Sequence, residues 1–153
     1  MGNDDLIELS ALSNHVRSVH RRRAQWGRFS VVGYQYSLPF MGGTFEKPES
    51  AIEDDLTALA IDVDADTIFV SHSPVFGILD PSLGDAHIGS RSLRHFLDAR
   101  PYLAHVHGHS HAGFGRSGKH FNVAAAGRQR AMLLDLETMK HLVLGSASER
   151  IEA

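Results

Sequence analysis

The chain has 153 residues, of which 42% are hydrophobic and 22% are charged, and this is the composition of one ordinary globular domain. Its formal net charge of -3 argues against a dedicated nucleic-acid surface, and the absence of cysteine excludes disulfides, thiolate metal sites and cysteine nucleophiles. No apolar run approaches the ~20 residues that a membrane-spanning helix needs, so we expect a soluble, cytoplasmic protein.

The first part of the chain predicts a helix and then a strand. Apolar residues at helical spacing indicate a helix over residues 6–23, namely Leu6, Leu9, Leu12 and Val16. Residues 28–36 are rich in β-branched and aromatic side chains, which predicts a strand. Pro39 and the Gly42-Gly43 pair then indicate a loop.

A second helix is expected after this loop. Ser50 and Glu53 have the spacing of a capping box, in which the serine begins the helix. The apolar stripe of this helix consists of Ile52, Leu56 and Leu59. Asp62, Asp64 and Asp66 alternate after it like part of a calcium loop, but the required glycine and distal glutamate are missing, which favours a plain polar loop.

The second half of the chain alternates strands with one helix. A buried strand is predicted at 67–70, and a glycine- and proline-rich loop then leads to a helix at 90–99, which Pro101 stops. The next strand is predicted at 103–107. Three short strands follow at 121–123, 131–136 and 141–144, the last two forming a hairpin. This order indicates an α/β fold with a β-rich C-terminal part.

Histidines gather at two strand ends. Residues 105–115 read His-Val-His-Gly-His-Ser-His-Ala-Gly-Phe-Gly, so four histidines alternate where a strand gives way to glycine. Because parallel strands bring their carboxyl ends to one edge of a sheet, we expect His72, His109 and His111 to meet there. Neutral imidazole is the commonest ligand for transition metals, although histidines on one strand face can also be plain polar residues.

Three short blocks resemble the calcineurin-like metallophosphoesterase family. Gly2-Asn3-Asp4-Asp5 is similar to the family's Gly-Asn-His-Asp/Glu block, and Ser71-His72 is similar to its isolated strand-end histidine. Gly108-His109-Ser110-His111 is similar to its Gly-His-x-His block. The order and spacing of the blocks also agree. The resemblance implies an α/β fold built as a metallophosphoesterase-type β-sandwich flanked by helices.

The resemblance also implies roles for individual residues. Asn3, His72 and His109 would bind one metal ion, and His111 would bind a second. Two divalent ions of Mn, Fe, Zn or Ni would hold a bridging hydroxide that attacks a small phosphomonoester or phosphodiester. Asp4 stands where many members keep a histidine that protonates the leaving group or steadies the phosphate, and this makes it the candidate catalytic residue; it could equally cap the following helix.

Two blocks of the family are missing. Its Asp-x-His and Gly-Asp-x-x-Asp blocks lie upstream of the Gly-Asn block, so we expect residues 1–153 to be a single domain that is truncated at its N-terminus and lacks its first strands. Asp85 and His87 form an Asp-x-His in a loop, which favours a substrate-facing or plain loop role over a ligand pair. A sheet without its first strands exposes an apolar edge, and we therefore expect a homodimer or an aggregation-prone chain.

Two functional hypotheses follow. The first is a metal-dependent phosphoesterase with a binuclear metal centre, complete if the missing blocks lie upstream or come from a partner. The alternative is a catalytically inactive remnant that binds one metal or none and serves as an interaction module. A regulatory nucleotide-binding module ranks last, because the chain has no Gly-x-x-x-x-Gly-Lys phosphate loop.

Overall fold

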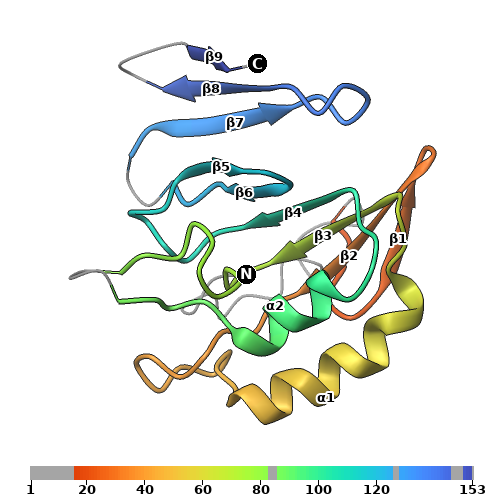
Figure 1. Cartoon of the computed structure of the whole chain (residues 1–153), viewed down its shortest axis with the longest axis vertical. Helices are drawn as coiled ribbons and strands as arrows, with labels where there is room; N and C mark the ends of the chain where they lie inside the picture. The colour runs from red at the N-terminus through yellow and green to blue at the C-terminus, as the bar shows by residue number, and fades with distance from the viewer. Residues whose placement is uncertain (1–15, 83–85, 126–127, 146–149, 153) are drawn as a thin grey trace.

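A computed structural model describes residues 16–82, 86–125, 128–145 and 150–152, which form a mixed α/β fold with a mostly parallel central sheet and few helices (Figure 1). Within these residues the elements follow one another as β1 (Arg23–Trp26), β2 (Phe29–Tyr34), α1 (Glu49–Leu59), the 3-10 helix η2 (Ala60–Asp62), β3 (Thr67–Ser71), α2 (Arg91–Asp98), β4 (Ala104–His107), β5 (Gly115–Ser117), β6 (His120–Asn122), β7 (Arg130–Leu134), β8 (His141–Gly145) and β9 (Arg150–Glu152).

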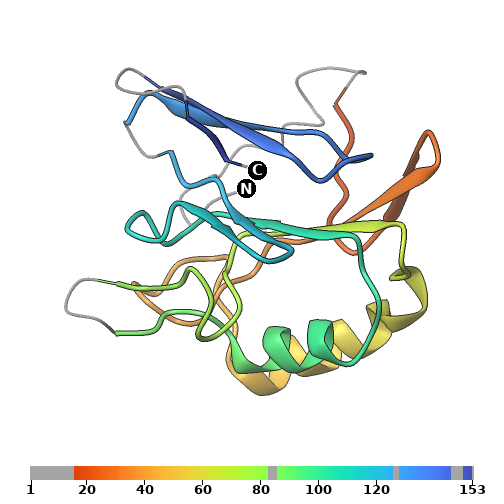
Figure 2. The ribbon, with the colours of Figure 1, turned by 45° about the horizontal axis from the view of Figure 1, so that its top comes forward.

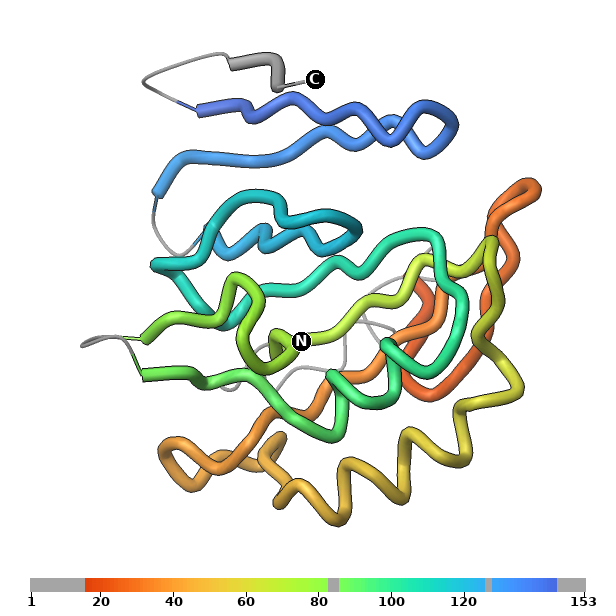
Figure 3. Tube along the Cα trace, in the orientation of Figure 1, coloured from red at the N-terminus to blue at the C-terminus, as the bar shows by residue number. Residues whose placement is uncertain are grey.

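The central sheet has the strand order β1-β2-β3-β4-β6-β5. Strands β2, β3, β4 and β6 run parallel, and β1 and β5 pair antiparallel at the two edges. The loops that follow β2, β3 and β4 therefore lie at the same end of the sheet (Figure 3). In an open parallel sheet this carboxyl end is where ligands bind.

Helices α1 and α2 cover one face of the central sheet, and the hydrophobic core lies between them and the sheet (Figure 2). The apolar stripe predicted for α1 is buried there, and α2 contributes Leu93, Phe96 and Leu97 as expected. The rings of Phe69 on β3 and Phe96 on α2 lie 5.6 Å apart. The glutamate that begins α1, Glu49, joins the two helices because its carboxylate accepts hydrogen bonds from the backbone N–H groups of Arg91 and Ser92.

The opposite face of the sheet is covered by a second, three-stranded sheet of order β7-β8-β9 (Figure 2). Its β7–β8 hairpin confirms the pairing predicted for the C-terminal strands. The rings of Phe121 on β6 and His141 on β8 lie 6.0 Å apart and join the two sheets. Arg130 also donates to the carbonyl of Ala124 at the end of the central sheet.

Two local predictions were wrong. The helix expected over residues 6–23 falls partly outside the described residues, and its described part contains no helix: residues 23–26 form β1 instead. The reason is the turn at Gly27, whose φ of 59° lets β1 fold back antiparallel onto β2. The capping box was also wrong, because Pro48 is the N-cap of α1 and no side chain caps this helix. Strands β5 and β9 were not predicted.

Neither α1 nor α2, nor any other helix in the part of the chain that the structure describes, is long and apolar enough to cross a membrane.

Candidate functional site

Two of the predicted metal ligands, His72 and His109, lie together at the carboxyl end of the central sheet. Strands β3 and β4 are neighbours, and their last residues, Ser71 and His107, lie opposite each other, so the two strands end side by side. The backbone N–H of Gly108 then donates to the carbonyl of His72 at 3.3 Å. As a result, the imidazole rings of His72 and His109 meet edge to face with centroids 4.7 Å apart.

The backbone at His109 has an unusual conformation. Its φ is 63°, in the left-handed region that few residues other than glycine adopt. The Ser110 N–H donates to the Gly108 carbonyl at 2.8 Å, so a hydrogen bond closes a turn around His109. Such strained residues persist only where the surroundings hold them, and they cluster at functional sites. The turn directs the His109 side chain toward His72 and away from the line of β4.

The predicted ligand His111 is exposed, and its carbonyl accepts a hydrogen bond from Arg130 at 3.0 Å. Burial lowers the pKa of His109, the neighbouring His111 lowers it further, and Glu46 partly opposes them. The neutral imidazole that results is the form that binds metals. Asn3 and Asp4 lie outside the described residues. Among the residues that are described, no group of three or more His, Asp or Glu side chains is arranged to hold a metal ion.

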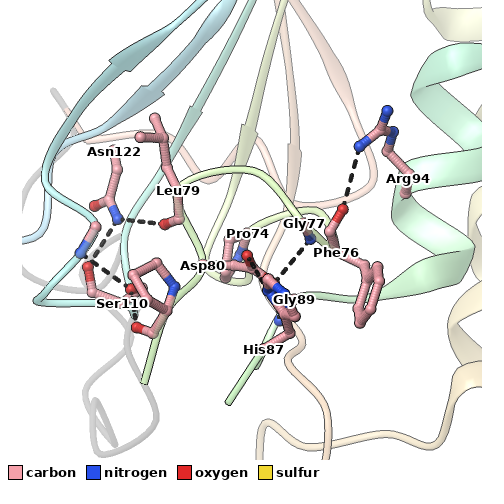
Figure 4. Close-up of polar contacts among 12 residues, drawn as sticks. Pro74, Phe76, Gly77, Leu79, Asp80, His87, Gly89, Arg94, Ser110 and Asn122 are labelled. Carbon is pink, nitrogen blue, oxygen red and sulfur yellow. Dashed lines mark hydrogen bonds and ion pairs between the residues drawn. The ribbon is translucent and has the colours of Figure 1, made fainter. Parts of the chain in front are cut away.

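The segment that carries His109 and His111 is held in place by hydrogen bonds of the Ser110 and Asn122 side chains (Figure 4). Both side chains are buried. The Asn122 amide donates to the carbonyls of Ser110 at 2.7 Å and Leu79 at 3.0 Å, and the Ser110 hydroxyl donates to the Pro81 carbonyl at 2.6 Å. Gly113 approaches so closely that an added Cβ would lie 2.2 Å from the Leu79 oxygen. The loop after β3 and the turn after β4 therefore form one hydrogen-bonded unit.

The loop between His72 and α2 is organised around the buried carboxylate of Asp80 (Figure 4). This carboxylate accepts hydrogen bonds from the backbone N–H groups of Gly77 at 3.0 Å and Gly89 at 3.1 Å. Its other oxygen lies 2.9 Å from Nδ1 of His87. Asp85 lies outside the described residues. His87, for which the sequence favoured a substrate-facing or plain loop role, contacts Asp80 within this loop.

A chain of buried histidines lies beneath the site and was not predicted. The Ser71 hydroxyl donates to the Ser73 carbonyl at 2.5 Å, so it accepts from Nε2–H of His105 at 2.7 Å. Nδ1 of His105 then accepts from Nδ1–H of His120 at 3.0 Å, and Nε2 of His120 accepts from the Tyr102 hydroxyl at 3.0 Å. The hydrogen bonds thus run in one direction through two neutral rings and end at the turn that carries His72.

This chain of buried histidines requires both rings to stay neutral. Burial lowers the pKa of His120 to about 4 and lowers the pKa of His105 well below its usual value. The alternation of His105 and His107 on one strand was visible in the sequence and gave the only hint of it. The partner of His105 on β6, His120, is set by the pairing of β4 with β6, which no local pattern encodes.

Comparison with known proteins adds a likeness of fold. No protein-family model and no curated protein sequence matches the chain. One solved crystal structure is 20% identical, with a TM-score of 0.72 over 90% of this chain. Another, of the protein TT1561 from Thermus thermophilus, is 18% identical, with a TM-score of 0.61 over 90% of this chain. The chain spans 57% and 62% of the lengths of these two proteins. At this identity the likeness shows the shared fold alone.

Proposed function

We propose that this chain carries part of the active site of a metal-dependent phosphoesterase, built as a metallophosphoesterase-type sandwich of two sheets. The observation that carries the proposal is the meeting of His72 and His109, whose rings lie 4.7 Å apart at the carboxyl ends of adjacent parallel strands. The strained turn at His109 supports it, because the backbone is held in an unfavourable conformation that aims a ligand-type side chain at a second one.

The donor set fits part of such a centre. Two neutral imidazoles suit Zn, Mn, Fe or Ni. By the resemblance, Asn3 would bind the first ion together with His72 and His109, and His111 would bind the second ion. His111 is exposed and therefore accessible to a metal ion. When bound, the divalent ions would activate a water and neutralise the phosphoryl oxygens of a small phosphate ester. The hydrogen bonds of Ser71 with His105 and Ser73 hold the turn that carries His72 in place, and the turn around His109 orients its side chain.

Metal content per chain tests the proposal. The protein, purified without chelator or metal-binding tag, is dialysed against Zn²⁺ or Mn²⁺ and analysed by mass spectrometry, and hydrolysis of an aryl phosphodiester is followed with the same metal. We expect His72→Ala and His109→Ala each to weaken metal binding by more than about tenfold and to abolish hydrolysis. His95→Ala is the matched control, because His95 is exposed on α2. Equal metal content and rates in all four proteins would refute the proposal.

The alternative is a catalytically inactive remnant that binds one metal or none. It draws on the observation that the ring contact at the sheet edge joins two of the predicted ligands, His72 and His109. This alternative predicts at most one bound ion per chain and no hydrolysis with any of the four metals. About two ions per chain together with turnover would exclude it.

A further inference from the structure

An exposed aromatic side chain lies beside the candidate site. Phe40 is 62% exposed and its neighbour Met41 is 84% exposed, both in the loop that follows β2. The ring of Phe40 meets the ring of His109 edge to face, with centroids 6.1 Å apart. Phe40, His109 and His72 therefore form a row of three rings that runs from solvent to the strand-end histidines.

The loop holds Phe40 and Met41 in a defined position. The carboxylate of Glu46 accepts hydrogen bonds from the backbone N–H groups of Phe40 at 2.9 Å, Met41 at 3.0 Å and Gly42 at 3.0 Å. These bonds, with Met41 and Phe40 contributing most, lower the pKa of Glu46 to about 2, so the carboxylate stays ionised at neutral pH. An exposed apolar pair that is pinned in this way is organised before a ligand arrives.

The base of the loop is closed as well. The Ser37 N–H donates to the Phe45 carbonyl at 3.0 Å, and the Lys47 N–H donates to the Ser37 carbonyl at 2.8 Å. Gly42 has a φ of 79°, which allows the tight return of the chain after Met41. The loop is thus a closed unit whose apolar tip is anchored next to the histidines.

We propose that Phe40, with Met41, is the platform on which the planar aromatic group of the substrate stacks, so that the natural substrate class is a nucleotide or nucleotide ester. This inference rests on the proposed phosphoesterase function. A nucleotide carries its phosphate and its base at opposite ends of one sugar, which matches a metal-binding pair of histidines, whose ions would hold the phosphate, with an aromatic ring beside it. Stacking on an aromatic side chain tolerates any base, because every base has a π-face.

The size of the patch favours a small ligand over a protein. A stable protein partner needs about 800 Å² on each side, whereas the platform consists of two side chains on one closed loop. An aliphatic phosphate ester would gain little from Phe40, because it has no flat face to lay on the ring. The platform therefore predicts discrimination between phosphate esters that differ only in the presence of a base.

Binding of AMP and of ribose 5-phosphate to the whole chain in the presence of Zn²⁺, measured by isothermal titration calorimetry, tests the platform. The two probes share the sugar phosphate and differ by the base. We expect AMP to bind about tenfold more tightly than ribose 5-phosphate. Phe40→Ala should remove this difference while leaving the affinity for ribose 5-phosphate unchanged, and Phe40→Trp should keep it. Ile61→Ala is the control, because Ile61 is an apolar residue in η2 that is 90% exposed and lies outside the loop and the site.

The outcomes distinguish failure of the Phe40 platform from failure of the phosphoesterase site. Equal affinity of the wild-type chain for both probes would overturn the platform but leave the phosphate site standing. An equal loss for both probes in Phe40→Ala would also overturn it, because Phe40 would then only support His109. If neither probe binds, the proposed phosphoesterase site is refuted and the platform with it.

Discussion

Mild acid should destabilise this protein through its chain of buried neutral histidines. His120 is buried, and burial lowers its pKa from 6.5 to about 4, with Arg94 adding to the effect and Asp98 opposing it. A histidine with a depressed pKa stabilises the folded state above its unfolded pKa of 6.5. That stability is lost as the pH falls from 6.5 toward 4, because the unfolded chain takes up the proton first.

The size of the effect follows from the two pKa values. The full difference between the two pKa values of His120 corresponds to about 3 kcal/mol of the free energy of unfolding. Lowering the pH from 7.5 to 5 should remove about 2 kcal/mol of this amount. His105 shifts in the same direction and adds to the loss. A proton on Nδ1 of His105 would also face the N–H of His120, and the directed run of hydrogen bonds to Ser71 would break.

Urea unfolding followed by circular dichroism at several pH values from 7.5 to 5 measures this loss. His120→Gln should be less stable than the wild type at pH 7.5, yet its stability should fall by about 2 kcal/mol less over the same range. His95→Gln, on the exposed side of α2, should keep the wild-type slope. A wild-type stability that stays constant down to pH 5, or an unchanged slope in His120→Gln, would refute the reasoning.

Three further predictions concern stability and assembly. Glu49→Gln should lower the free energy of unfolding by about 1–2 kcal/mol, because Glu49 binds the N-terminus of α2; Glu53→Gln, exposed on α1, should have little effect in the same urea titration. Gly113→Ala should cost at least about 2 kcal/mol, since its Cβ would collide with the Leu79 carbonyl, whereas Gly108→Ala meets nothing within 4 Å and should be tolerated. The expected homodimer stays a prediction that light scattering tests, and a monodisperse monomer at high concentration would contradict it.

Local patterns in the sequence determined most of the elements. The strands β2, β3, β4 and β8 and the helices α1 and α2 were predicted within a few residues, because the spacing of apolar residues within each segment indicates its secondary structure. The same patterns placed His72 and His109 at strand ends, and they were expected to meet because parallel strands bring their carboxyl ends to one edge of a sheet. The contact between the rings of His72 and His109 confirms the expected meeting for these two histidines, and the third, His111, is exposed.

Tertiary structure decided what surrounds these histidines. The partners of His105 come from β3 and β6, and Phe40 reaches His109 from the loop after β2. Parallel strands are joined by long crossovers, so such contacts depend on pairings between distant segments and leave no local trace in the sequence. For the same reason the left-handed turn at His109 could not be foreseen, because contacts with distant segments, such as the hydrogen bond from Ser110 to Pro81 in the loop after β3, help to hold the backbone in that conformation.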